Sequence, residues 1–189
     1  MKILSTNTIM SAMTAVVALI FSLFCSCADD ADTDYARHDA FLRITSVSTI
    51  HPLHSALNSP GIFCQITFSA SHYQFLNTHG RSATLPRTAL DAYGEPRYVS
   101  GFIVGLPNGM LTASGTMMPI AYDLVCPYCF DSSLIQRRLS LNEQGKASCQ
   151  RCESVYNMNN GGFPESGPSN LKLLKYHLQY GNDVLVINN

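Results

Sequence analysis

Two C-x-x-C pairs constrain this 189-residue chain more than any other feature. Their four cysteines, Cys126, Cys129, Cys149 and Cys152, read C-x2-C-x19-C-x2-C. A C-x-x-C turn places two sulfurs on one side of a tight loop, and two facing turns form a tetrahedron that suits zinc or iron. No histidine lies between residues 80 and 176. The spacing therefore predicts one metal site made of sulfur ligands alone.

The residues that follow the second pair resemble those of a known family. In chain order they are Ser154, Tyr156, Gly161, Gly162, Gly167, Pro168, Leu171, Leu174 and Tyr176. This order resembles the second cluster-binding box and proline loop of Rieske ferredoxin-type domains, where C-x-x-H-G-S, an aromatic residue, a glycine, G-P and a closing L-x-x-Y strand recur. Upstream, Ala121-Tyr122-Asp123 before Cys126 resembles the strand that leads into the first box, C-x-H. The likeness covers roughly residues 97 to 188.

The chain departs from the family at the ligand positions. The histidine of the first box falls on Tyr128, the histidine of the second box falls on Cys152, and the glycine after it is Glu153. In Rieske centres two histidines hold one of the two irons. Both are absent at the matched positions, where Cys129 and Cys152 offer sulfur instead. The resemblance therefore implies the fold but not a Rieske cluster.

The resemblance also implies a layout for the site. Two loops, residues 126–129 and 149–168, would carry the metal. The proline loop, residues 161–168, would shield it. Ser154 and Tyr156 match positions whose hydroxyl groups or rings lie near the cluster sulfurs and tune them. For the proline loop, an ordinary Gly/Pro turn between strands is the alternative that composition alone allows.

Four thiolates suit zinc, a single rubredoxin-type iron or an all-cysteine two-iron, two-sulfur (2Fe-2S) cluster. Zinc needs no assembly machinery and no redox role. We therefore expect a structural, non-catalytic zinc ion with four protein ligands and no open position. The 2Fe-2S cluster that the family implies would instead make the protein an electron carrier with a redox partner.

Two further hypotheses need no metal. In an oxidising compartment the four cysteines would form two disulfides. Alternatively, one C-x-x-C pair would act as a thiol-disulfide redox centre, with Lys146 and Arg151 supplying positive charge that lowers a cysteine pKa. Because C-x-x-C disulfides close strained small loops that are typical of redox catalysts rather than structural bridges, two pairs at this spacing favour metal.

Residues 1–27 have the pattern of an export signal. Lys2 precedes an uncharged apolar run, residues 9–24, which ends just before Ser26-Cys27. A small residue followed by cysteine resembles the end of a bacterial lipoprotein signal peptide, with Cys27 as the lipidated residue; Cys25 follows Phe24 and fits less well. A plain cleaved signal peptide and an uncleaved anchor helix are the alternatives.

Residues 28–40 are polar and acidic, and predict a flexible tether. The acidic run after Cys27 resembles the surface-export tether of lipoproteins in the Bacteroides group. This resemblance implies a lipid-anchored protein of the cell envelope, held in the outer membrane and exposed at the surface. The membrane is then a partner through the lipid anchor, together with a protein or redox partner that the sequence does not name.

The short strands expected in residues 41–189 predict a single all-β domain, an antiparallel sandwich or small barrel. The resemblance implies that this domain is Rieske-like, with a two-loop, rubredoxin-like metal-binding subdomain. We expect strands in the ranges 41–47, 62–68, 101–105, 120–125, 134–141, 146–148, 171–178 and 184–187. Hairpin turns are expected at Pro107-Asn108-Gly109 and at Asn142–Gly145. Residues 70–96, which contain several glycines and prolines, predict a long irregular loop.

Composition excludes a nucleic-acid partner, because 12 basic and 13 acidic residues provide no positive field. No hydrolase or nucleotide-binding motif is present, and no residue stands out as a nucleophile or a base. Cys64 lies in an expected strand and is interpreted as a buried apolar residue. The N-terminal histidines, His51, His54, His72 and His79, fit no ligand spacing and are interpreted as loop or surface residues.

Overall fold

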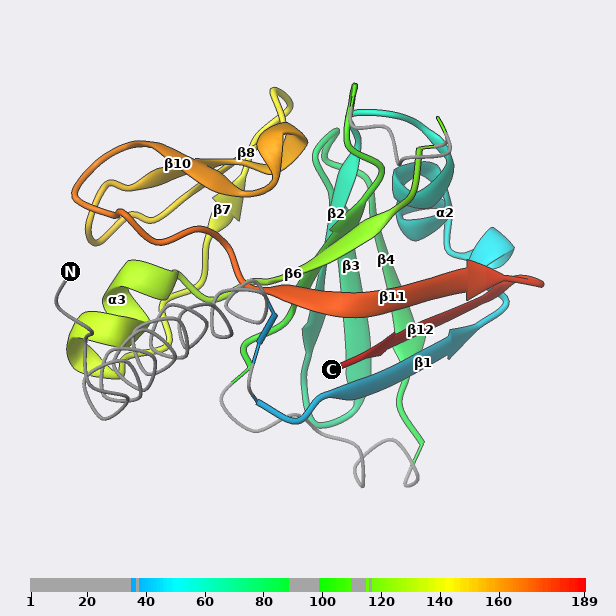
Figure 1. Cartoon of the computed structure of the whole chain (residues 1–189). Coiled ribbons are helices and arrows are strands. Elements are labelled where there is room, and N and C mark those ends of the chain that lie inside the picture. The colour runs from blue at the N-terminus through cyan, green and yellow to red at the C-terminus, as the bar shows by residue number, and fades with distance from the viewer. Residues whose placement is uncertain (1–34, 37, 89–98, 110–114, 116) are drawn as a thin grey trace, which may run out of the picture. The chain divides into compact units, whose positions relative to one another are not determined.

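Two antiparallel sheets form the part of the chain that the computed structural model describes, which is residues 35–36, 38–88, 99–109, 115 and 117–189. The larger sheet contains, in spatial order, β1 (Phe41–Thr45), β12 (Val184–Asn188), β11 (Lys175–Gly181), β6 (Ile120–Asp123), β5 (Phe102–Gly105), β2 (Phe63–Phe68), β3 (His72–Asn77) and β4 (Ser82–Pro86). It curls into a half-barrel, with β1 and β4 as its edges (Figure 1).

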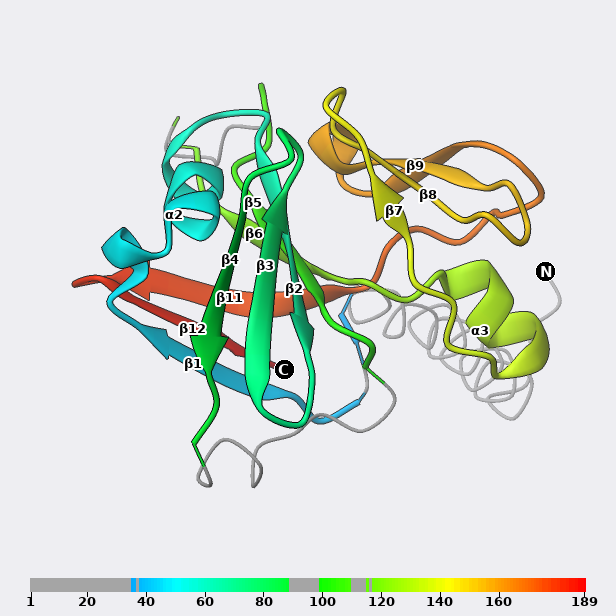
Figure 2. The ribbon, with the colours of Figure 1, turned by 180° about the vertical axis from the view of Figure 1, so that it is seen from behind.

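The smaller sheet is inserted in the chain between β6 and β11. Its order is β10 (Phe163–Ser166), β9 (Val155–Asn157), β8 (Lys146–Ser148) and β7 (Ser140–Leu141). Figure 2 shows β7, β8 and β9 grouped beside the end of the half-barrel, with α3 (Pro127–Ser133) below them. We call residues 124–174, which include this sheet and α3, the inserted subdomain.

Short helices complete the fold. They are the 3-10 turn η1 (Val47–Thr49), the helix α2 (His51–Asn58), α3 and the 3-10 turn η3 (Met158–Asn160). Pro52 stands in the first turn of α2, where its missing N–H costs no hydrogen bond. Pro52, Leu53, Ala56 and Leu57 are buried, so the helix covers the concave side of the half-barrel near β3 and β5.

The period-two geometry of the central strands divides the core in two. From β5, Phe102 and Val104 join the core of the half-barrel, while Ile103 points to the opposite face and joins the core of the inserted subdomain. Ala121 and Tyr122 of β6 divide in the same way. This is why β5 is buried along its whole length, as a strand covered on both faces must be.

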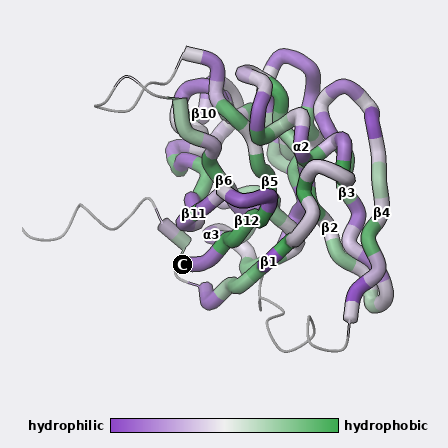
Figure 3. Tube along the Cα trace, turned by 90° about the vertical axis from the view of Figure 1, so that its right-hand side faces the viewer, coloured by the Kyte–Doolittle hydropathy of each residue, from purple (hydrophilic) through white to green (hydrophobic). Residues whose placement is uncertain are grey.

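The hydropathy of the residues follows the arrangement of strands and turns. Figure 3 shows hydrophobic stretches along the strands of the half-barrel, with hydrophilic residues in many of the turns that join them. In β1 the alternation is simple, because Leu42 and Ile44 are buried and their neighbours are exposed.

The prediction of a mostly β, antiparallel fold is confirmed, while the form is a curled half-barrel with a second sheet. The expected strand at 62–68 is present as β2, and the turn Asn142–Gly145 does join β7 to β8. Gly145, at φ +70°, takes the left-handed conformation that this turn requires.

The prediction of an irregular loop at 70–96 is wrong for its first part. Residues 72–77 and 82–86 form β3 and β4, and Tyr73, Phe75 and Asn77 are the buried set of β3. Gly80, at φ +75°, marks the turn between the two strands, and Pro86 is tolerated because β4 is an edge strand. Residues 89–98 lie outside the described residues.

Three smaller expectations also change. Pro107–Gly109 is not a tight hairpin, because β5 ends at Gly105 and its partner β6 begins only at Ile120. The last hairpin runs later than expected, with β11 beginning at Lys175 rather than at Leu171. The proline loop contains the strand β10, which pairs with β9, so it is not wholly a turn.

Candidate metal centre

The first cysteine loop begins where β6 ends. Asp123 Oδ1 accepts a hydrogen bond from the Val125 N–H at 2.9 Å, and the Cys126 N–H donates to the Arg137 carbonyl at 2.7 Å. Cys126 then caps α3, whose first residue is Pro127, and its carbonyl accepts from the Phe130 N–H. The loop is therefore one helical turn rather than the expected tight turn, and Cys129 is carried on α3.

The second cysteine loop connects β8 to β9. The Cys149 N–H donates to the Ser154 carbonyl at 3.0 Å, and the Glu153 N–H donates to the Cys149 carbonyl at 2.9 Å. Glu153 has φ +60°, a left-handed conformation in which glycine is the least strained residue. A glutamate therefore occupies a backbone position that favours glycine.

The two loops bring all four cysteine sulfurs together. Every pair of Sγ atoms lies within 4.8 Å, and the shortest contacts cross between the loops, at 3.6 Å for Cys126–Cys152 and 3.7 Å for Cys129–Cys149. The cysteines are free, since a disulfide would hold its sulfurs at about 2.05 Å. Cys126, Cys129 and Cys149 are buried and Cys152 is half-buried. Four convergent thiols of this kind can bind a metal ion.

Two hydroxyl groups lie against these sulfurs. Tyr156 Oη is 3.5 Å from Cys126 Sγ, and Ser154 Oγ is 3.3 Å from Cys152 Sγ, so each is within reach of a hydrogen bond to sulfur. Both side chains are completely buried. On a deprotonated cysteine each hydroxyl would donate, which would stabilise the negative charge of the thiolate.

The four thiols differ in acidity. Burial raises the pKa of Cys126 and, together with the hydrogen bond to Cys149, that of Cys129. Burial also opposes ionisation of Cys152, but the hydroxyl and backbone N–H of Ser154 and the neighbouring thiols outweigh it and lower the pKa of Cys152 to about 7. A bound cation would be needed to hold all four as thiolates, because like charges this close disfavour one another.

The proline loop packs directly on the second cysteine loop. Gly167 has φ +90°, and a Cβ atom there would lie 2.5 Å from the Cα and 2.8 Å from the N of Ser154. Only glycine allows this approach. Gly167 thus lies against the residue whose hydroxyl contacts Cys152; Pro168, the next residue, is exposed.

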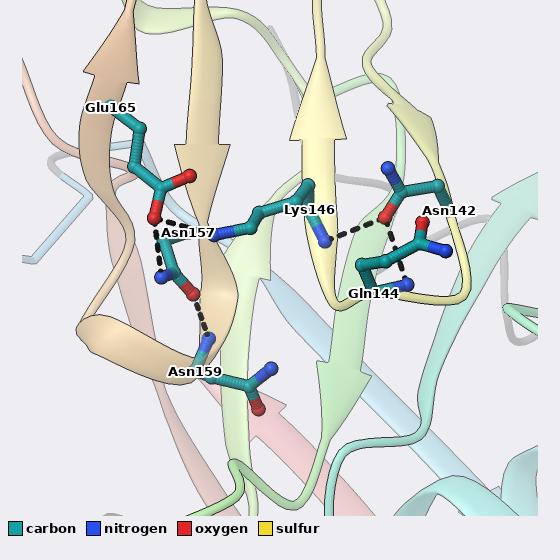
Figure 4. Close-up of polar contacts among 6 residues, drawn as sticks. All are labelled: Asn142, Gln144, Lys146, Asn157, Asn159 and Glu165. Atoms are coloured by element: carbon teal, nitrogen blue, oxygen red, sulfur yellow. Dashed lines mark hydrogen bonds and ion pairs between the residues drawn. The ribbon is translucent and has the colours of Figure 1, made fainter.

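A polar network joins the strands of the small sheet (Figure 4). Glu165 on β10 accepts from Lys146 on β8 and, at 2.7 Å, from the Asn157 side chain on β9. Asn142 Oδ1 accepts from the backbone N–H groups of Gln144 and Lys146 at 3.1 and 3.0 Å, which closes the β7–β8 turn. The network thereby fixes the strands on either side of the second cysteine loop.

The same network reaches the half-barrel. The Asn157 side chain accepts from the Asn159 N–H at 3.0 Å, and the Asn159 side chain accepts from the Asn108 N–H at 2.8 Å. Asn108 lies just after β5. The side chain of Lys146, expected as a source of positive charge for a redox cysteine, is instead engaged by Glu165, whereas Arg151 is exposed.

The other singled-out residues lie away from the cysteine cluster. Cys64 is fully buried in β2, and burial raises its pKa to about 12, as expected for an apolar core residue. The four N-terminal histidines of the sequence analysis are exposed. Cys27 and the other residues of the expected export signal lie outside the described residues. Within the described residues, no helix is long and apolar enough to cross a membrane.

Sequence reasoning missed Asp123 and the network of Figure 4. Asp123 is 4% exposed, and burial raises its pKa to about 7 against the hydrogen bonds from Val125 and Tyr176. Its position three residues before Cys126 was a usable signal, since buried acids beside ligand loops fix their geometry. The network was not visible, because its members come from separate strands.

No family model matches the chain, and no curated protein is significantly similar to it.

Proposed function

We propose that the chain binds one zinc ion through Cys126, Cys129, Cys149 and Cys152, and that this ion is structural. The observation that carries the proposal is the spacing of the sulfurs, with cross-loop contacts of 3.6 and 3.7 Å. A tetrahedral site with zinc–sulfur bonds of 2.3 Å separates its sulfurs by about 3.8 Å. The thiols therefore need to move very little to surround one ion.

The spacing favours one metal ion over a two-iron cluster. In a 2Fe-2S cluster two cysteines bind each iron, so cysteines on different irons are separated by the iron–iron distance as well as by two iron–sulfur bonds. Here all four sulfurs lie within 4.8 Å, which is compatible with a shared central ion. Four protein ligands leave no open position for a substrate, so the site is non-catalytic.

A structural role agrees with where the cysteines lie. Cys126, Cys129 and Cys149 belong to the core of the inserted subdomain, together with Leu124 and Tyr156. Because the subdomain has a small apolar core of its own, a metal ion that links its two loops would supply much of its folding free energy.

We further propose that the domain is Rieske-like with a changed ligand set. Two cysteine loops, one on α3 and one between β8 and β9 of the small sheet, lie in an insertion between β6 and β11, which agrees with the two-loop subdomain that the resemblance implies. The proximity of Ser154 and Tyr156 to the sulfurs agrees with it as well. We propose, from the sequence of residues 1–40, that the protein is a lipoprotein of the cell envelope anchored at Cys27.

Metal analysis of the full-length chain, purified without added metal, tests the assignment. We expect one zinc per chain, no visible absorption, and loss of zinc from a Cys126→Ser, Cys149→Ser double variant but not from Cys64→Ser. A metal-free wild-type chain that does not take up zinc would overturn the proposal. Cys64 is a matched control, because it is an equally buried cysteine outside the cluster.

Electron transfer through a single iron is the second candidate. The partial exposure of Cys152 favours it, since an electron must reach the metal from the protein surface. The hydroxyls on Cys126 and Cys152 would then tune the reduction potential. Iron with a visible thiolate absorption band and no acid-labile sulfide would establish a single iron in place of zinc, and its reversible reduction would support electron transfer; acid-labile sulfide would indicate a 2Fe-2S cluster.

A further inference from the structure

The larger sheet opens between β6 and β11. The two strands pair only at Tyr122↔Lys175 and Ala121↔Tyr176, although β11 continues to Gly181. The pairing stops where Pro119 precedes β6, because proline has no N–H to donate to a neighbouring strand. Beyond this point Figure 1 shows β6 rising away from β11.

The turn at the far end of β11 determines which backbone groups face this opening. Asn182 and Asp183 have φ values of 50° and 61° and form a two-residue loop between the paired residues Gly181 and Val184. In such a hairpin the pair next to the loop exchanges hydrogen bonds, and hydrogen-bonded pairs then alternate along the strands. Residues 181, 179 and 177 therefore bond to β12, so Leu178 and Tyr180 direct their N–H and C=O groups away from it.

The N–H and C=O groups of Leu178 and Tyr180 have no strand partner among the described residues, because the pairing of β11 with β6 ends at Tyr176. The Tyr180 hydroxyl is used separately, accepting a hydrogen bond from the Asn58 side chain of α2 at 3.3 Å. The exposed edge of β11 thus offers two donors and two acceptors in the spacing of a β-strand.

A cavity of about 510 Å³ lies along this edge. Its lining is largely apolar: Met118, Pro119, Leu178, Tyr180, Val184 and Val186 contribute to it. Met118 is 57% exposed and adds apolar surface to this lining. Leu178 and Tyr180 lie on the concave face of the sheet, and Val184 and Val186 lie on the opposite face.

We propose that the opening between β6 and β11 binds an extended peptide segment of a partner protein, which adds to the edge of β11 at Leu178 and Tyr180. The peptide backbone would pair with the unpartnered groups of these two residues. Its successive side chains would point to opposite faces, one toward Leu178 and Tyr180 and the next toward Met118 and Gln179, beyond which Val186 lies on β12. The partner segment is therefore apolar on the face toward Leu178 and Tyr180, and it is short, because only one end of β11 is open.

An extended peptide fits better than other occupants. A compact apolar ligand would leave the N–H and C=O groups of Leu178 and Tyr180 without partners, which is unfavourable once water is displaced. The edge strand of a second folded copy would carry its own sheet into the space between β6 and β11. A single extended chain satisfies the backbone and needs only the width of one strand. This inference does not depend on the metal centre.

The probe is a fluorescein-labelled peptide, Thr-Val-Thr-Val-Thr with blocked ends, titrated into the full-length protein in detergent and followed by fluorescence anisotropy. A second peptide carries N-methyl groups on alternate residues, facing β11, and cannot donate hydrogen bonds to it. We expect the first peptide to bind and to slow amide exchange at Leu178 and Tyr180 by at least about tenfold, a margin worth about 1.4 kcal/mol. The N-methylated peptide should bind at least about tenfold more weakly.

Variants locate the binding. Met118→Lys places a charge in the cavity and should weaken binding at least about tenfold. Leu76→Lys is the matched control, because Leu76 is also an exposed apolar residue on a strand of the same sheet but lies on β3. Equal affinity for the two peptides, no protection of residues 178 and 180, or equal loss of binding in both variants would overturn the proposal. If the peptide bound only after deletion of residues 110–114, the occupant of the opening would instead be the chain's own segment between β5 and β6.

Discussion

Asp123 shows how one residue links the half-barrel to the first cysteine loop. It pairs with Phe102 in the sheet, accepts from the Val125 N–H, and lies 3.5 Å from the Tyr176 hydroxyl. Because the residue is buried, its pKa is raised to about 7 and its carboxyl group is held largely protonated at acid pH. The segment that delivers Cys126 is thus fixed by a hydrogen-bonding group that carries little charge.

This residue gives a pH prediction. Its pKa is raised from 3.8 to about 7, so the folded chain binds the proton more tightly than the unfolded chain between these values. Its contribution to stability is therefore complete below about pH 4 and is lost as pH rises toward 7. Asp123→Asn should remove this slope and raise the free energy of unfolding at pH 8 by on the order of 3 kcal/mol relative to wild type.

Urea unfolding of both metal-loaded proteins between pH 4.5 and 8 checks this prediction. The cysteine ligands titrate equally in the two proteins, so the difference between their stability curves isolates Asp123. If the stability curves of wild type and Asp123→Asn ran parallel between pH 4.5 and 8, Asp123 would already be ionised in the folded chain throughout this range.

Single residues also mark the limit of what the sequence could predict. The four cysteines were identifiable because their spacing alone defines the chemistry. Glu153 was noted as a departure from the family, but its positive φ is a property of the backbone that side-chain type does not reveal. The hydroxyls of Ser154 and Tyr156 were placed near the cysteines by resemblance, and their distances to the sulfurs required the structure.

At the scale of elements, the proline loop and the second cysteine loop are packed backbone to backbone. Gly167→Ala would bring a Cβ within 2.5 Å of the Ser154 Cα and also strain φ, so we expect a loss of about 2–4 kcal/mol in stability and weaker metal binding. Gly80→Ala is the matched control, since Gly80 has φ +75° but nothing within 4 Å of the added atom. It should cost about 1 kcal/mol and leave metal affinity unchanged.

Thermal unfolding and competition with a zinc chelator measure the two effects. If both variants lose stability equally and metal binding stays intact, the contact between Gly167 and Ser154 does not shape the site.

The two cysteine loops also predict which disulfides form without metal. After chelation, treatment with diamide should join Cys126 to Cys152 and Cys129 to Cys149, because these sulfurs are 3.6 and 3.7 Å apart. Each disulfide forms from two thiols, whose two electrons and two protons reduce one diamide to its hydrazine. Trypsin cleaves after Arg151 and chymotrypsin after Tyr128, so mass spectrometry of the unreduced digest resolves the pairing. Disulfides within each C-x-x-C pair would contradict the arrangement.

Elements differ in how readily the sequence reveals them. β1 and β2 carry alternating apolar residues and were predicted close to their true bounds. Strands β3 and β4 were obscured by Gly80 and Pro86, which punctuate the hairpin and end the edge strand. The helix α2 has only eight residues and begins with His51-Pro52, so it offered too short a periodic segment to recognise.

At the scale of the whole molecule, the two hydrophobic cores predict separate responses to metal loss. The cysteines belong to the core of the inserted subdomain, whereas Leu53, Ile66, Leu185 and Ile187 belong to the core of the half-barrel. Chelation should therefore abolish amide protection in β8 and β9 and leave β2 and β12 protected.

Hydrogen exchange of the full-length protein, before and after chelation, measures this. Restoring zinc should restore protection in β8 and β9. Uniform loss across both sheets would show that the two cores unfold as one unit, and unchanged protection would show that the metal does not stabilise the fold.

The register of β6 and β11 has a consequence for how this chain can vary. Tyr122 and Lys175 are opposite each other in adjacent strands, so the inserted subdomain leaves the half-barrel and returns to it at the same place. The two ends of the insertion are as close together as the ends of a hairpin turn. A module attached in this way can be lengthened, shortened or exchanged without altering the register of the strands that hold it. The cysteine loops can therefore vary while the register of β6 and β11 stays the same.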